Sequence, residues 1–409
     1  MRYQFRSGRA LPSFFIGSLT IAAIAGCKPP AETTAGDNTA KGGPSRVAAT
    51  TAKPYAGDDI LLGEYGSMTG NEATFGQSSH KGIQMAVDEA NAAGGVLNKK
   101  IRVQVEDDSG EPAQAATAVK KLINQNNVLA VLGEVASSNS LAAAPVCQSA
   151  GVPMISPTST NPKVTEVGDY IFRTCFIDPF QGTVTARFAK ETLKAKNAAI
   201  LTDMKSDYSV GLTQYFKEEF QKSGKIVAEE NFSKGDSDFR AQLTRIKGSK
   251  PDVIFIPGYY TEVGNIAKQA RSLGMPQPML GGDGWESSKL IAIGKEAIEG
   301  SYFSTHYSPE NKDDPRVVKF VADFKKRHKG ETPDALAAVA YDAARIMIDA
   351  IKRAGGTDRA KIRDAIAATK NFPGVTGNIT IDENRNAVKP LVILQVKNGG
   401  YHYVTTVKP

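Results

Sequence analysis

The chain has 409 residues, which is too long for one ordinary hydrophobic core and suits two lobes. Its hydrophobic content of 41% is ordinary for a soluble globular protein. The formal net charge is +7, and removal of Arg2, Arg6 and Arg9 with an export segment leaves 7 − 3 = +4. The remaining basic residues are interspersed with acidic ones, so the sequence predicts no nucleic-acid partner.

The N-terminus has the pattern of an export signal. The three arginines precede an apolar stretch over residues 14–25, which is shorter than the ~20 residues of a membrane span. Ile-Ala-Gly-Cys over residues 24–27 then resembles a bacterial lipobox, whose cysteine receives lipid. We expect residues 1–27 to be a lipoprotein signal peptide ending at the lipidated Cys27, which places the protein in the periplasm as a membrane-anchored lipoprotein. The alternative is an ordinary secretory signal with a chance cysteine.

Residues 28–57 follow as a predicted disordered tether. They are rich in Ala, Thr, Gly and Pro and have no periodic apolar positions, so they cannot bury enough surface to fold.

Strands alternate with helices after this tether. Strands are expected over residues 60–65, 101–105, 128–132 and 152–155, with helices over 80–93, 112–124 and 141–150. A second series has strands over 198–201, 226–228, 253–256 and 279–280, with helices over 210–223, 239–247 and 261–273. Residues 301–305 are expected to cross back to the first lobe, followed by a long helix over 335–354 and a hairpin over 392–396 and 401–405.

This order predicts an α/β fold with two doubly wound parallel-sheet lobes. We assign residues 58–178 with 306–385 to the N-terminal lobe, and residues 179–305 with 386–409 to the C-terminal lobe.

Ligands bind beyond the carboxyl ends of open parallel sheets, so the residues that follow the predicted strands are the candidates. Ser137 precedes a predicted helix, whose free N–H groups suit a carboxylate, and Ser137 and Thr160 would add hydroxyl donors. The alternative for this serine is plain helix capping.

Asp283, between glycines, could pair with an α-ammonium group, although it could also be a turn residue. Phe75, Tyr208 and Tyr259 could wall a side-chain pocket, although each could also be core packing.

Four segments carry a resemblance to the amino-acid-binding proteins of branched-chain amino-acid ABC transporters. They are Asn-Ala-Ala-Gly-Gly-Val-Leu-Asn-Lys-Lys at the start of 91–108, Leu-Gly-Glu-Tyr-Gly-Ser-Met-Thr-Gly over 62–70, Ile-Ser-Pro-Thr-Ser-Thr-Asn-Pro over 155–162, and Gly-Tyr-Tyr-Thr-Glu over 258–262. The resemblance covers the body from about residue 60 to the C-terminus. It implies a type I periplasmic binding protein fold, with two lobes joined by a multi-strand hinge.

The resemblance also implies roles for residues. The positions of Ser137 and Thr160 bind the ligand carboxylate through hydroxyls, the backbone carbonyl at Thr158 faces the ammonium, and an acid at Asp283 pairs with it. Leucine binders of the transporter type carry Glu at this last position.

For the aromatic positions, the resemblance implies that Tyr208 and Tyr259 close the cleft and that Phe75 flanks the ligand side chain. Two cysteines that form a disulfide in family members correspond to Ser109 and Ala136 here. A bridge between Cys147 and Cys175 and two free thiols both remain open.

Enzyme interpretations have little support in the sequence. The four histidines form no close metal-ligand pair with another His or Cys, and neither a nucleophile elbow nor a phosphate-binding loop is present. Asp107 and Asp108 could be paired catalytic acids, but they are better explained as capping or solvated groups at a strand end. We expect no catalytic residues, no metal and no cofactor.

The sequence therefore predicts a solute-binding protein, monomeric and lipid-anchored, that captures an aliphatic, branched-chain amino acid between its lobes. Its partner would be the membrane permease of an ABC importer. One alternative is a sensor of the same fold for amides, urea or another small metabolite. A less favoured one is an exported hydrolase.

Overall fold

The structure, a computed structural model, describes residues 54–409. The predicted signal peptide, the lipidation site at Cys27 and the tether up to residue 53 lie outside the described residues. Within residues 54–409, none of the helices combines the length and apolar character that crossing a membrane requires.

The first sheet is fully parallel, with the strand order β2-β1-β3-β4-β5. Its strands are β1 (Ile60–Gly66), β2 (Ile101–Asp107), β3 (Ala130–Leu132), β4 (Met154–Ser156) and β5 (Ile171–Arg173). The intervening helices are α1 (Ala73–Ala92), α2 (Pro112–Asn124), α3 (Ser137–Ala150) and α4 (Lys163–Glu166). Strands β3, β4 and β5 are buried at every position, as expected where helices cover both faces of a parallel sheet.

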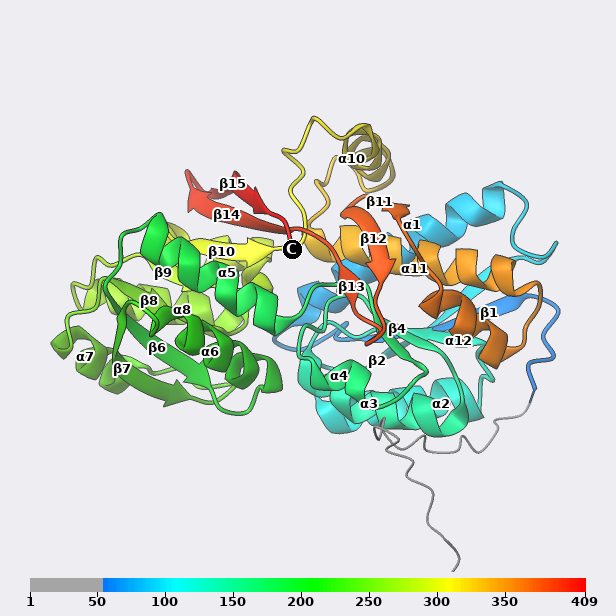
Figure 1. Cartoon of the computed structure of the whole chain (residues 1–409), viewed down its shortest axis with the longest axis horizontal. Coiled ribbons are helices and arrows are strands. Elements are labelled where there is room, and N and C mark those ends of the chain that lie inside the picture. The colour runs from blue at the N-terminus through cyan, green and yellow to red at the C-terminus, as the bar shows by residue number, and fades with distance from the viewer. Residues whose placement is uncertain (1–53) are drawn as a thin grey trace, which may run out of the picture. The chain divides into compact units, whose positions relative to one another are not determined.

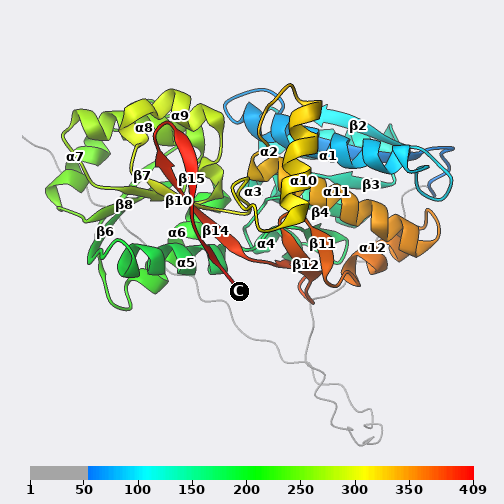
Figure 2. The same cartoon turned by 90° about the horizontal axis from the view of Figure 1, so that it is seen from above.

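Three later helices complete the core of this first lobe: α10 (Pro315–Arg327), α11 (Ala335–Ala354) and α12 (Arg359–Ala367). Helix α11 packs along α1, and the two run side by side in both cartoon views (Figures 1 and 2). Gly82 makes this close approach possible, because a Cβ atom there would lie 2.0 Å from the carbonyl oxygen of Ala337.

A small antiparallel sheet lies beyond α12. It contains β11 (Phe372–Gly374), β12 (Gly377–Ile381) and β13 (Ala387–Val388). The buried Asp342 of α11 accepts hydrogen bonds from the backbone N–H groups of Val375 and Thr376, each at 2.9 Å. These bonds fix the turn between β11 and β12 against the first lobe.

The second sheet has the order β15-β14-β10-β9-β8-β6-β7. Its strands are β6 (Asn197–Asp203), β7 (Lys225–Phe232), β8 (Val253–Phe255), β9 (Met279–Gly281), β10 (Tyr302–Thr305), β14 (Leu391–Lys397) and β15 (Gly400–Val407). Strands β7, β6, β8, β9 and β10, in that order across the sheet, are parallel. The terminal hairpin joins the sheet through β14, which pairs with β10 in antiparallel orientation.

The helical elements of this second lobe are α5 (Asp178–Glu191), α6 (Asp207–Phe220), α7 (Arg240–Gly248), α8 (Tyr260–Ser272), α9 (Ser288–Gly294) and the short 3-10 turns η1 (Asp283–Trp285) and η2 (Lys295–Ile298). The strands and helices enclose one large apolar cluster.

The chain passes between the two lobes through three segments, residues 174–177, 306–314 and 389–390. Figure 1 shows them as the green, yellow and red connections in the middle of the molecule. These crossings confirm the predicted α/β fold with a multi-strand hinge. The lobe boundaries assigned from the sequence, after residues 178, 305 and 385, fall at or near the crossings and remain predictions.

Most predicted elements are present, and the bounds of α2 and α11 are those expected. Two helices begin a full turn or more before their predicted starts: α1 at Ala73 rather than residue 80, and α3 at Ser137 rather than residue 141. Their first turns are rich in Ser, Thr and Gly, which are typical of loops by propensity, and burial against the other lobe overrides this preference. Strand β5 and helix α5 were not predicted.

Candidate ligand-binding site

Three predicted aromatic residues meet where the lobes face each other. Phe75 of α1 lies edge-on against Tyr259, with ring centroids 5.4 Å apart at 83°. Tyr259 in turn stacks on Tyr208 of α6 at 5.5 Å and 4°. All three side chains are buried and belong to the large apolar cluster. The sequence left two interpretations open for these aromatic residues, a pocket wall and core packing. In the structure the rings pack against one another in a contact that joins residues of different lobes, so the two interpretations describe the same place.

The loop after β4 is held rigidly by a buried arginine. Arg173 donates through its two terminal nitrogens to the backbone oxygens of Ser159, at 2.6 Å, and Asn161, at 2.8 Å. The Ser159 hydroxyl donates to the carbonyl oxygen of Glu134 at 2.9 Å. On either side of this anchored serine lie Thr158 and Thr160, both buried. Within residues 54–409 the Thr158 hydroxyl has no hydrogen-bond partner.

Ser137 adjoins this threonine loop. Its hydroxyl accepts a hydrogen bond from the backbone N–H of Asn161 at 3.3 Å. Because Ser137 is the first residue of α3 and Ala136 occupies the capping position without a side-chain bond, simple capping by Ser137 does not describe its role. The bond between Ser137 and Asn161 joins the start of α3, whose first N–H groups can face an anion, to the loop that carries Thr158 and Thr160.

Asp178, which sequence reasoning missed, adds a buried acid to this group. Its backbone N–H donates to the carbonyl oxygen of Thr160 at 3.0 Å. Its carboxylate lies beside the Thr160 hydroxyl, yet neither oxygen makes a well-formed hydrogen bond within the described part of the chain. Burial raises the pKa of Asp178 to about 8, and the negative charge of Asp283 adds to this effect. Recognition of β5 would have revealed Asp178, because it follows that strand just as the other candidates follow theirs.

Asp283 lies in the turn η1 and is held by two side chains. Gln181 of α5 donates to Oδ1 at 2.8 Å, and Nε2 of His306 lies 3.1 Å from Oδ2. The adjacent N–H of Gly284 donates to the Tyr208 hydroxyl at 3.3 Å. The predicted acid is therefore buried, oriented and next to the aromatic wall. Gln181 and His306 were not singled out from the sequence, because isolated Gln and His residues carry no positional signal.

Hydrogen bonds join the lobes around these residues. The Ser138 hydroxyl donates to the Asp207 carboxylate at 2.8 Å and accepts from the Asp207 N–H at 2.9 Å. The Thr261 hydroxyl donates to the backbone oxygen of Asn71 at 2.9 Å. The hydroxyls of Thr74 and Ser287 lie 3.0 Å apart. These contacts come from both sheets, so they require the two lobes to approach each other.

A cleft of about 220 Å³ opens between the lobes next to the aromatic wall. First-lobe residues Glu72, Ala136 and Asn139 and second-lobe residues Lys234 and Tyr259 are among those that line it. Asn139 has a buried side-chain nitrogen without a hydrogen-bond partner among residues 54–409. The cleft thus reaches the start of α3 and the aromatic contact from outside.

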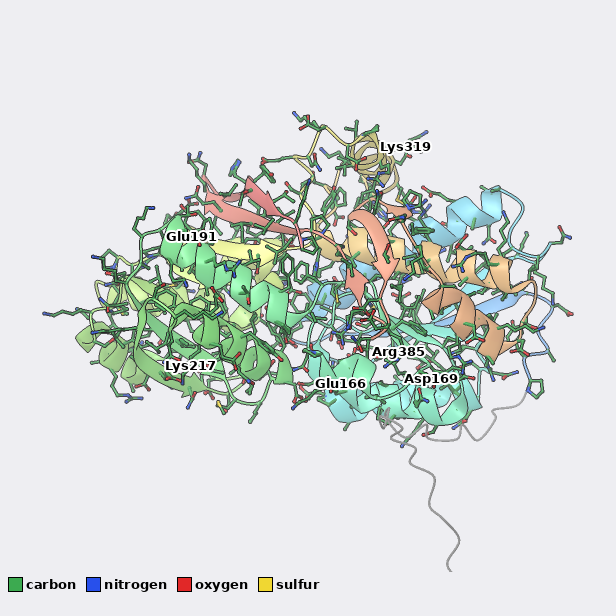
Figure 3. All side chains as sticks on the ribbon, viewed as in Figure 1. Glu166, Asp169, Glu191, Lys217, Lys319 and Arg385 are labelled. Carbon is green, nitrogen blue, oxygen red and sulfur yellow. The ribbon has the colours of Figure 1, made fainter. Side chains whose placement is uncertain are left out.

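A larger surface cleft, of about 330 Å³, lies elsewhere on the first lobe, between α12 and β12. Asp169 and Arg385, labelled in Figure 3, line it together with Arg363. Arg363 is paired within it, with Asp169 at 3.0 Å and with Asp364 at 2.6 Å. It brings together none of the candidates, so the interlobe group is the better supported site.

Cys147 and Cys175 are both free and buried in the described part of the chain. Cys147 belongs to the core of the first lobe, whereas Cys175 lies in a hinge crossing, where its thiol contacts the carbonyl oxygen of Ser159 at 3.3 Å. Burial raises the pKa of Cys175 to about 12. Of the two arrangements left open by the sequence, the structure has the free thiols. Among residues 54–409, no His, Cys, Asp and Glu side chains cluster in a way that could hold a metal ion.

Comparison with known proteins identifies the fold and the family. The sequence profile of a periplasmic binding protein family matches residues 60–401, nearly all of the described chain. The chain belongs to this family. A Leu/Ile/Val-binding protein of Rhizobium johnstonii is 33% identical over 340 residues, which cover 82% of this chain and 91% of the relative.

Two solved structures are similar over the same region. The leucine-binding protein LivK of Thermotoga maritima is 42% identical, with a TM-score of 0.83 over 86% of this chain and 99% of that chain. The branched-chain amino-acid transporter substrate-binding protein LivJ of Streptococcus pneumoniae, in complex with isoleucine, is 37% identical, with a TM-score of 0.82 over 86% of this chain and all of that chain. These matches confirm the predicted family and its two-lobed fold. This family of periplasmic binding proteins consists of extracytoplasmic substrate-binding proteins rather than enzymes.

Proposed function

We propose that this periplasmic binding protein captures an aliphatic amino acid, of the branched-chain class, between its lobes and delivers it to an ABC import permease. The observation that carries the proposal is the set of polar groups at the lobe interface. The Thr158 hydroxyl and both oxygens of Asp178 are buried without well-formed hydrogen bonds within residues 54–409, and the second-lobe acid Asp283 is next to the Phe75–Tyr259–Tyr208 wall.

The chemistry of this set matches a zwitterion. The first turn of α3, Ser137 and Thr160 supply donors for a carboxylate, and buried unpaired donors are costly unless a ligand satisfies them. Asp178 and Asp283 supply two acids for an ammonium group. The three aromatic rings supply an apolar surface for the side chain. No covalent step is needed, so we infer binding without turnover.

Donors and acids come from different lobes, and this gives the ligand a way to favour closure. Ser137, Thr158 and Thr160 belong to the first lobe, whereas Tyr208 and Asp283 belong to the second. A ligand that touches both sets has a higher affinity for the closed arrangement than for an open one. The closed arrangement would then be the form that the permease recognises.

The names of similar proteins support the same ligand class. The Rhizobium relative is named a Leu/Ile/Val-binding protein, the Thermotoga structure is a leucine-binding protein, and the Streptococcus structure is described with isoleucine. The resemblance implies Glu in leucine binders of the transporter type at the position where this chain carries Asp283. The shorter acid moves the charge away from the ligand and gives Asp178 a larger share of the ammonium contact.

We also propose that the protein is a monomer anchored to a membrane in the periplasm by lipid on Cys27. The lipobox-like segment before Cys27 and the low-complexity tether after it support this proposal. Metabolic labelling with a palmitate analogue tests it: the wild-type protein should incorporate label, and Cys27→Ala should not. Label in both forms, or in neither, would contradict the anchor.

Isothermal titration calorimetry of the purified protein tests the ligand. Leucine, isoleucine, valine and alanine are titrated, with a dicarboxylic amino acid and a simple amide as comparison. We expect micromolar or tighter binding of at least one branched-chain amino acid and much weaker binding of the comparison compounds. If none of the amino acids binds more tightly than millimolar, the proposal is wrong.

A further inference from the structure

His306 occupies an unusual position between the hinge and the acid of the candidate site. It directly follows β10 and is the first residue of the second hinge crossing. Its side chain is fully buried. One ring face lies against Phe176 of the first crossing, with centroids 4.0 Å apart at 32°, while Nε2 lies 3.1 Å from Oδ2 of Asp283. One imidazole thus connects two crossings to the acid.

The hydrogen bond fixes the chemical state of this histidine. Burial lowers the pKa of His306, the hydrogen bond to Asp283 and the charge of Asp283 raise it, and the positive charge of Lys389 on the third crossing lowers it, so that the pKa lies below its ordinary value. The ring is therefore neutral at physiological pH, with its single proton on Nε2, where the Asp283 carboxylate accepts it. Nδ1 has no hydrogen-bond partner among the described residues, which is tolerable for an unprotonated nitrogen but costly for an N–H group.

The Asp283 carboxylate depends on side-chain donors because the turn that carries it is short and uncapped. The residue lies in a three-residue turn between Gly282 and Gly284, and no side chain caps this turn. Gln181 holds one carboxylate oxygen and His306 holds the other. Donors from two separate elements, α5 and the hinge, thereby determine where the charge points.

We propose that His306 is a positioning residue for ligand binding, which holds the Asp283 carboxylate in place for the ammonium group of the bound amino acid. This inference rests on the proposed function. It adds a residue to the site that makes no ligand contact of its own. It also ties the orientation of the acid to the hinge, because the imidazole belongs to one crossing segment and packs against Phe176 of another.

The experiment compares two substitutions by calorimetry. His306→Phe keeps a ring against Phe176 and removes the donor, and the neighbouring cavity of about 90 Å³ leaves room for the larger ring. His306→Gln keeps a donor near the position of Nε2. His402→Leu serves as the matched control, since His402 forms an exposed pair with Glu310 at 3.3 Å outside the site. The probes are leucine and its 2-hydroxy analogue, which lacks the ammonium group.

We expect His306→Phe to weaken leucine binding about 10- to 100-fold, the range of a hydrogen bond to a charged group. His306→Gln should recover most of this loss, and His402→Leu should bind as the wild type does. Binding of the 2-hydroxy analogue should change much less than that of leucine. In the background of Asp283→Asn, His306→Phe should cause little further loss, because the two residues act as one unit.

Three other outcomes would contradict the inference. If the wild type binds leucine but His306→Phe binds it equally well, the inference is wrong while the proposed function stands. If His306→Phe weakens leucine and the 2-hydroxy analogue equally, and Gln gives no recovery, His306 acts only on folding, and the inference is again wrong. If the wild type binds no amino acid, both the proposed function and this inference are wrong. Thermal melting of each variant shows whether it is folded.

Discussion

The Lys234 ammonium group lies 3.1 Å from the Glu72 carboxylate, and the two residues belong to different lobes. Lys234 also donates to the backbone oxygen of Gly110 at 2.5 Å and lies 3.3 Å from the Glu111 carboxylate. Because all three partners are in the first lobe, a single side chain of the second lobe bridges the mouth of the cleft.

Loss of this bridge should weaken ligand binding without unfolding either lobe. We expect Lys234→Met to lower leucine affinity about tenfold, because the closed arrangement loses hydrogen bonds to a charged group. Lys217→Met is the matched control, since Lys217 pairs with Glu229 at 2.7 Å within the second lobe. Calorimetry measures both. Equal affinities of Lys234→Met and the wild type would show that the bridge contributes nothing to closure.

Asp178 should make ligand binding dependent on pH. Its pKa is about 8 because of burial, so the free closed protein holds it protonated at neutral pH, and an ammonium ligand would favour the ionised form. Binding should therefore release protons, and affinity should rise as the pH increases from about 6 to 8. Calorimetry in buffers of different ionisation enthalpy measures this release. Asp178→Asn should abolish the release and bind leucine more weakly.

The same carboxyl group should affect the stability of the ligand-free protein. Its folded-state pKa of about 8 lies above the ordinary value, so the stability linked to it is fully present at low pH and is lost as the pH rises through 8. Asp178→Asn should therefore raise the melting temperature more at pH 9 than at pH 5. A stabilisation that is equal at both pH values would show that Asp178 is ionised in the folded protein.

Phe75 should contribute to the affinity for large side chains in particular. Its ring contacts both Tyr259 and Tyr260, at 5.4 and 5.2 Å, so truncation opens the apolar wall. We expect Phe75→Ala to weaken leucine binding about 10- to 100-fold, because a buried aromatic ring is worth a few kcal/mol. Alanine binding should fall less. Tyr403→Ala is the control, because Tyr403 is an exposed residue of β15. Equal losses for the two ligands would place Phe75 away from the ligand side chain.

Gly82 should be required for the packing of α1 on α11. A Cβ atom there would lie 2.0 Å from the backbone oxygen of Ala337, and backbone cannot yield as a side chain can. Gly82→Ala should lower the free energy of unfolding by about 1–3 kcal/mol or more. Gly248→Ala is the matched control, since its added Cβ meets nothing within 4 Å. Chemical denaturation compares the two, and equal stabilities would contradict the close approach.

The sequence predicted elements and residues correctly where local patterns determine the structure. The predicted bounds of α2 and α11 agree with the structure to the residue. The glycine and hydroxyl residues after strands led to Thr158, Tyr259 and Asp283, because parallel strands place such loops at one edge of a sheet. Phe75 and Tyr208 were found in the same way, and the structure brings them into contact through Tyr259.

The features of the site that the sequence did not reveal depend on contacts between residues that are far apart in the chain. Asp178 was missed because β5 was missed: this short strand ends in a buried arginine, Arg173, and so does not read as an apolar run. Gln181 and His306 matter only through Asp283, which lies 102 and 23 residues away from them in the sequence. The early start of α3 at Ser137 depends on packing that local propensity does not contain.

The threefold passage of the chain between the lobes has a consequence for biosynthesis. The core of the first lobe takes α11 from residues 335–354, so it lacks a main layer until after the whole second sheet up to β10 has been made. The second sheet in turn receives its last two strands from the C-terminal residues. The first lobe therefore cannot be completed until most of the second lobe has been synthesised, and the second sheet in turn waits for β14 and β15, which follow the last elements of the first lobe.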